Sequence, residues 1–196
     1  MESDRMPDLW TPSFVRLSLG NLFLFVSLYM LLPVLPVVMG SRLGLPIYWT
    51  GSIFLFFTLG MCIAGPFYNY LIDTYKRKLL ALLSFALLGV GTVGYVFVSN
   101  FGEFVLLALL QGVMLGVVTT MIITLAIDIS ASHCRSAANM AFAWLARLGM
   151  ILGISVGLIL DQIQGLETII YSSVAIGAVG VLCLMGCISL SVLLSE

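Results

Sequence analysis

The stretch 104–127, FVLLALLQGVMLGVVTTMIITLAI, contains no charged residue and decides the class of fold. A helix crosses the hydrocarbon core of a membrane with about 20 apolar residues, so this stretch predicts a transmembrane helix. Charge is also absent from 17–41, 43–72, 79–102 and 168–195, and the stretch 136–160 contains only Arg147. We therefore predict six membrane-spanning helices near 13–39, 48–73, 79–98, 103–128, 137–160 and 168–194.

The composition of the whole chain agrees with a membrane protein. Of 196 residues, 61% are hydrophobic, and 8 basic and 9 acidic residues give a net charge of −1. Soluble domains carry about a quarter charged residues, which excludes a soluble globular protein. No basic block is present, so nucleic acid is excluded as a partner. We expect one bundle over residues 1–196, surrounded by membrane lipid and without a soluble domain.

The apolar runs are continuous, which favours an all-α polytopic bundle over a transmembrane β-barrel. Barrel strands alternate apolar and polar residues over about ten positions, and no such alternation is needed in a helix. The 19 glycines fit packed helices, because small residues let helices approach closely in lipid.

Basic residues near the span ends predict the orientation, because cytoplasmic loops carry an excess of lysine and arginine. With the amino terminus in the cytoplasm, Arg42 alone lies outside. The residues on the inside are then Arg5, Arg16, Lys76, Arg77, Lys78 and Arg135. We expect a multi-pass protein of the cell (inner) membrane with both termini in the cytoplasm. The short connections leave no room for an extramembrane catalytic domain.

The turn after the second span reads NYLIDTYKRK at 69–78. It resembles the Gly-x-Leu-x-Asp-Arg-x-Gly-Arg-Lys loop signature of the major facilitator superfamily, which joins helices two and three. Leu71, Asp73, Arg77 and Lys78 match, whereas the two glycines and the first basic residue of the signature are replaced.

Two further stretches are similar to motifs of the same family. Gly149, Gly153 and Gly157 follow a spacing of four, as in the fifth helix of the family's drug:proton antiporters, with Ile154 where that motif has proline. We expect this stripe to pack on a neighbouring helix. The segment ALLQG at 108–112 is similar to the family's Arg-x-x-Gln-Gly, without its arginine.

The resemblance covers the chain as the amino-terminal six-helix half of a twelve-helix transporter. It implies two inverted three-helix repeats, and the sequence Leu-Gly-Met at both 59–61 and 148–150 is a trace of them. A Gly65-Pro66 pair predicts a kink in the second span.

Five charged residues fall at one cytoplasmic level in the predicted topology: Asp73, Arg77, Lys78, Asp128 and Arg135. Ion pairs at a wet surface are individually weak, but a set that breaks when a bundle tilts biases two conformations. The resemblance implies that this motif stabilises the outward-facing state, so we predict a gating loop. The alternative is that the basic residues only set the topology.

Arg147 lies near the middle of the predicted fifth span. A central arginine costs about 2.5–3.5 kcal/mol to insert, so it normally faces a cavity or a partner. At about 100° per residue it points about 200° away from Gly149, which lets the glycine stripe pack while the guanidinium faces inward. Its partner is an anionic substrate, backbone carbonyls or an acid of a second half. Alternatively, the span is shifted and Arg147 snorkels to the interface.

Six other mid-span residues are candidates to line a substrate cavity: Asn21, Tyr29, Gln111, Thr119, Asn139 and Trp144. The first two lie eight residues apart, as do the next two, which places each pair within about 80° on one helix face. In the family, helices one, four and five line this half of the cavity. The alternative for each residue is a hydrogen bond that only joins helices.

Catalysis and metal binding have little support. The four cysteines and the single His133 lack the spacing of a metal site, so we predict no metal and no cofactor. The single histidine lies in a predicted loop, outside the spans in which an intramembrane enzyme would hold its base. We therefore do not expect an enzyme.

The function that we expect is transmembrane transport of a small-molecule substrate by alternating access, as one half of a secondary transporter. The resemblance implies proton-coupled efflux by an antiporter, with the coupling acid outside these spans. Because Glu196 falls at the predicted end of the sixth span, we expect the second half to be absent from this chain. Two alternatives stay open: a non-transporting membrane fragment or scaffold, and a half-size transporter that works as a homodimer.

Overall fold

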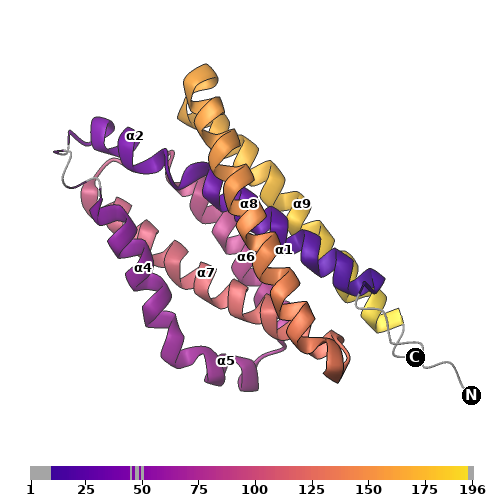
Figure 1. Ribbon diagram of the computed structural model, residues 1–196. Coiled ribbons are helices and arrows are strands. Elements are labelled where there is room, and N and C mark those ends of the chain that lie inside the picture. The colour runs from indigo at the N-terminus through magenta and orange to yellow at the C-terminus, as the bar shows by residue number, and fades with distance from the viewer. Residues whose placement is uncertain (1–9, 45, 47–48, 50, 194–196) are drawn as a thin grey trace, which may run out of the picture.

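The structure is a computed structural model that describes residues 10–44, 46, 49 and 51–193, and within these residues it contains helices and no strand (Figure 1). The predicted all-α class is confirmed. The helices are α1 (Pro12–Leu31), α2 (Leu35–Arg42), α4 (Ser52–Ala64), α5 (Tyr68–Thr74), α6 (Arg77–Gly94), α7 (Phe101–Ile129), α8 (Arg135–Gln164) and α9 (Leu166–Leu193). Two short 3-10 helices, η1 (Gly65–Phe67) and η2 (Ser132–Cys134), precede α5 and α8.

Five helical stretches of the described chain are long and apolar enough to cross a membrane. They are Pro12–Arg42, Arg77–Gly94, Phe101–Ile129, Ser132–Ile163 and Leu166–Gly186. The predicted second span is shorter than expected, with an apolar part at Phe54–Phe67. The chain is therefore a polytopic membrane protein, but its six predicted stretches are not of equal length.

Prolines explain why the first two predicted spans are not continuous helices. Between α1 and α2 lies a turn that contains Pro33, which lacks the N–H of a helical residue and clashes with the preceding turn. In the second span, Pro66 lies in η1, and α5 then turns away from the direction of α4 (Figure 1). The kink predicted at Gly65-Pro66 thus lies where the α-helix gives way to a 3-10 turn.

The long helices form two groups of three. In one group α1 packs against both α8 and α9, and in the other α7 packs against both α4 and α6. A further contact between α6 and α9 joins the groups. Figure 1 shows α4 and α7 on one side of the molecule and α8, α1 and α9 on the other. A buried cluster that includes Leu24, Phe85, Met121 and Phe142 forms the core between them.

Glycines set the closest helix contacts in the first group. A Cβ on Gly149 would lie 2.8 Å from the carbonyl oxygen of Leu22, and one on Gly153 would lie 2.7 Å from that of Val26. A Cβ on Gly157 would overlap the backbone of Met30. All three glycines are buried, so the stripe forms the surface of α8 that touches α1.

The second group has an equivalent contact. Gly60 of α4 and Gly112 of α7 face each other, and a Cβ on either would overlap a backbone carbonyl of the other helix. The backbones of α4 and α7 are therefore in direct contact, which a larger side chain at either position would prevent.

Candidate functional site

A cavity of about 420 Å³ lies where the two helix groups face each other, and we call it the central cavity. Four long helices contribute to it: α1, α4, α7 and α8. Its walls are formed by Phe25, Tyr29, Leu32, Phe54, Phe57, Thr58, Met61, Leu115, Thr119 and Met150. A small side pocket of about 80 Å³ shares Phe25 and Thr119 with it, so the two spaces adjoin.

The central cavity has apolar walls with a few polar groups. The hydroxyl of Thr119 lies 2.7 Å from the carbonyl oxygen of Leu115, and that of Thr58 donates to the carbonyl oxygen of Phe54 at 2.8 Å. Each hydroxyl bonds within its own helix and keeps lone pairs that accept a further hydrogen bond. Mostly apolar walls with a few fixed polar groups are typical of sites for small organic molecules.

Tyr29 and Thr119 are two of the predicted cavity residues, and both lie in the wall of the central cavity. Asn21 and Asn139 line the side pocket instead. The Asn21 side chain is buried, and its Nδ2 donates to the carbonyl oxygen of Phe142 at 3.2 Å. Asn21 therefore joins α1 to α8 as well as bordering the pocket.

Gln111 lies outside the cavity, contrary to the expectation. Its buried side chain faces α6, where Nε2 donates to the hydroxyl of Thr92 at 3.1 Å and to the carbonyl oxygen of Leu88 at 3.4 Å. Gly91 leaves room for it, because a Cβ there would lie 3.2 Å from the Gln111 Cγ. Gln111 therefore has the alternative role in this structure: its hydrogen bonds join α7 to α6.

Trp144 and Arg147 are exposed on α8 and belong to the wall of neither space. The guanidinium carbon of Arg147 lies 5.9 Å from the centroid of the Trp144 ring, within the range of a cation–π contact. Arg147 directly follows Ala146 of the side pocket and precedes Met150 of the central cavity by three residues. It therefore lies at the edge of the cavity-facing side of α8.

The structure brings together two of the five residues predicted for the gating loop. Arg77, at the start of α6, pairs with Asp128, near the end of α7, at 2.5 Å. Their side chains are 37% and 44% exposed. Asp73 and Arg135 are exposed and, in the described part of the chain, do not join this pair; Lys78 is partly buried at the second residue of α6.

A double-mutant cycle tests the Arg77–Asp128 pair. We expect Arg77→Gln and Asp128→Asn each to lower the free energy of unfolding slightly, with a coupling free energy of about 0.2–1 kcal/mol, because the pair is solvated. Unfolding of purified protein in detergent at low salt measures it. A coupling that is zero within error would show that the contact does not stabilise this conformation. A coupling that does not weaken in high salt would show that it does not come from a solvated ion pair.

Sequence reasoning missed Met61 and Met150, which line the central cavity from α4 and α8. Both follow a glycine in the repeated Leu-Gly-Met sequence, so the repeat was a usable signal. Methionine side chains are flexible and polarisable, which suits a wall that contacts ligands of varied shape. Among the described residues, no three His, Cys, Asp or Glu side chains gather closely enough to hold a metal ion.

The family model described as Major Facilitator Superfamily matches residues 17–193, which extend from α1 to the end of α9. No curated protein matches the chain significantly.

Proposed function

The chain belongs to the major facilitator superfamily, a family of membrane transporters, and we therefore propose that it moves a small solute through the central cavity. The main support for the proposal is the position of this cavity. It lies between two helix groups of a membrane protein, and it combines hydroxyl groups with aromatic and methionine side chains. Such walls suit a partly apolar solute with hydrogen-bonding groups.

We propose further that spans one to three (α1, α4 and α6) and spans four to six (α7, α8 and α9) are inverted three-helix repeats, and that each helix group combines the first span of one repeat with the second and third spans of the other. The contacts support this: the first long helix packs on the fifth and sixth, and the fourth packs on the second and third. Gly60 packs α4 on α7, and Gly149 packs α8 on α1. The methionine after each glycine reaches the central cavity. Equivalent residues in the two groups thus make equivalent contacts.

Alternating access is the mechanism that we infer, with this bundle as one of two that rock around the cavity. Arg147 supports a second bundle, because an exposed guanidinium near the middle of a membrane-spanning helix is costly in lipid. A second six-helix bundle or a second copy of the chain would cover this side of α8. The Arg77–Asp128 pair would then favour one of the two conformations.

For direction and coupling, we propose proton-coupled efflux across the cell (inner) membrane, with both termini in the cytoplasm. The glycine stripe of α8 supports the antiporter type by its similarity to that motif. The orientation rests on the excess of lysine and arginine on one side. Consistent with it, α1 begins and α9 ends at the same end of the molecule (Figure 1).

Blocking the central cavity tests transport without knowledge of the substrate. A tryptophan at Thr119 fills the cavity, whereas a tryptophan at Leu106, which is 69% exposed on the same helix, leaves it open. The content of small solutes is measured by mass spectrometry in cells that carry each protein. We expect wild type and Leu106→Trp to give the same content, and Thr119→Trp to change the content of at least one solute. Identical solute profiles at equal expression would favour the non-transporting scaffold.

A further inference from the structure

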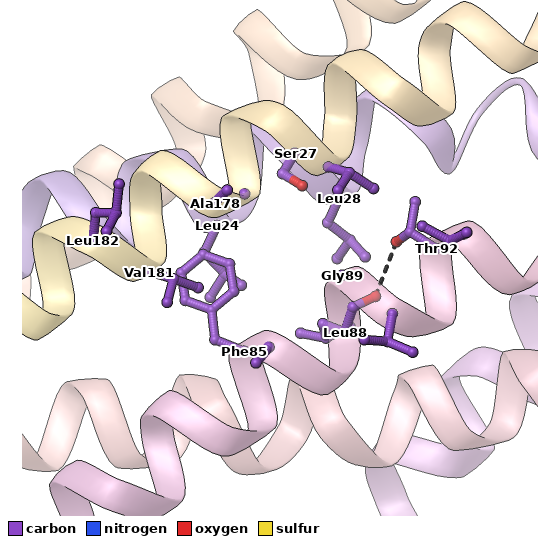
Figure 2. A pocket seen from close by; sticks show the side chains of 15 residues that line it. Leu24, Ser27, Leu28, Phe85, Leu88, Gly89, Thr92, Ala178, Val181 and Leu182 are labelled. Carbon is purple, nitrogen blue, oxygen red and sulfur yellow. Dashed lines mark hydrogen bonds between the residues drawn. The ribbon is translucent and has the colours of Figure 1, made fainter.

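A second cavity, of about 430 Å³, lies between α1, α6 and α9, and we call it the outer groove. Figure 2 shows Leu24 and Leu28 of α1, Phe85 and Leu88 of α6, and Val181 of α9 around it. It occupies a different face of α1 from the central cavity, whose α1 wall is formed by other residues. Transport as proposed above makes no use of this space.

The outer groove offers hydrocarbon walls and no free polar group to a ligand. The hydroxyl of Ser27 donates to the carbonyl oxygen of Ser173 at 2.8 Å and also lies 3.1 Å from the hydroxyl of Ser173. That of Thr92 donates to the carbonyl oxygen of Leu88 at 3.0 Å (Figure 2) and accepts from Nε2 of Gln111 at 3.1 Å. A buried water needs about two to four polar partners, and these walls do not supply them. The occupant that fits is therefore a hydrocarbon chain.

The position of the groove within the membrane favours a lipid chain. Val90 and Leu182 in its walls are 67% and 65% exposed, so the groove opens toward the bilayer. Leu24 lies about 18 Å from the start of α1 at 1.5 Å per residue, and half of the hydrocarbon core is about 15 Å thick. An acyl chain from the leaflet at the N-terminal end of α1 thus reaches the groove with its terminal part.

The cation Arg16 lies on α1 between the outer groove and the N-terminal end of that helix. The guanidinium of Arg16 donates to the carbonyl oxygen of Gly186 at 3.0 Å, and Gly186 follows Leu182 by one turn of α9. This bond uses one of the five N–H donors of the guanidinium. The others suit a phosphate group, which arginine binds with charge-assisted hydrogen bonds.

We propose that the outer groove binds one anionic phospholipid, with an acyl chain among the groove residues and its phosphate on Arg16. Leaving the bilayer gives the chain no hydrophobic gain, since lipid and groove are equally apolar. Selectivity therefore comes from the phosphate and the net charge of the headgroup. The bound chain fills the space between α6 and α9, where the two helix groups meet.

Native mass spectrometry of the full chain in mild detergent tests the proposal, with palmitoyl-oleoyl phosphatidylglycerol and phosphatidylcholine as probes. We expect the wild type to retain one phosphatidylglycerol in preference to phosphatidylcholine. Arg16→Gln removes this preference, and Arg16→Lys keeps it, because lysine also binds phosphate as a point charge.

The groove itself is tested with a matched pair of glycines. Gly89 lines the groove and Gly102 lies at the start of α7, and a Cβ on either would meet nothing within 4 Å. We expect Gly89→Phe to lose the bound lipid and Gly102→Phe to keep it. Ala178→Phe, from the opposite wall, gives the same readout if Gly89→Phe does not fold.

Two results would overturn the proposal: full lipid retention by folded Gly89→Phe or Ala178→Phe, or equal retention of both lipids by the wild type. Neither result bears on transport, because no residue of the central cavity is changed.

Discussion

Replacing Gly112 with leucine is expected to destabilise the bundle by about 3 kcal/mol, the upper part of the usual range for overpacking. The Cβ of any larger residue at this position overlaps the backbone carbonyl of Phe57, and Gly60 lies directly opposite. Backbone atoms cannot rotate away as a side chain does, so α4 and α7 must separate. The cavity wall that these two helices share would be lost with the contact.

The matched control is Gly102→Leu, on the same helix, where a Cβ meets nothing within 4 Å. Size-exclusion chromatography of detergent-purified protein after stepwise heating compares the two variants. We expect Gly112→Leu to lose its monodisperse peak at a much lower temperature than the wild type, and Gly102→Leu to match the wild type. Equal stability of all three proteins would show that α4 and α7 are not in backbone contact.

Replacing Arg147 with leucine is expected to abolish transport while leaving the folded yield unchanged or higher. Removing a charge from the middle of a membrane helix favours insertion by about 2.5–3.5 kcal/mol on translocon scales. Leucine also removes the cation that lies beside the cavity-facing side of α8 and contacts Trp144. If Arg147 serves the transported solute or the second bundle, transport is therefore lost while the folded yield is not.

The assay compares export of the solute identified with the Thr119→Trp variant, at matched amounts of protein in the membrane. Arg147→Lys keeps the charge without the planar donor geometry, so we expect partial activity. If Arg147→Leu transports like the wild type, Arg147 snorkels to the interface and plays no part in transport.

The membrane class and the helix positions were predictable because charged residues cannot be spread through a spanning helix at low cost. The uncharged stretch 104–127 lies inside α7, and the structure extends it to Phe101 and Ile129. The break after α1 was not predicted, although Pro33 and Pro36 were visible, because hydropathy alone does not register the loss of a backbone donor.

The site was predictable only in part, because two residues that lie within about 80° of each other on one helix can still contact different neighbouring helices. Thr119 and Gln111 share such a face of α7, yet Thr119 lines the central cavity and Gln111 bonds to α6. Only the packing of the neighbouring helices separates the two outcomes. The methionines of the cavity carry no polar group, so nothing in their chemistry marked them in a chain with 10 methionines.

Transport through the central cavity requires the space between α1, α4, α7 and α8 to be open to solvent at mid-membrane. Thr119 lies about 15 Å from the nearer end of α7, and Leu182 lies at a similar depth from the end of α9, where it faces the bilayer. Each is changed to cysteine in a background in which the four natural cysteines are serine. Both variants are then exposed, in membranes, to a permanently charged thiol reagent.

We expect modification of Thr119→Cys and protection of Leu182→Cys. Protection of both, or equal modification of both, would overturn transport through the central cavity.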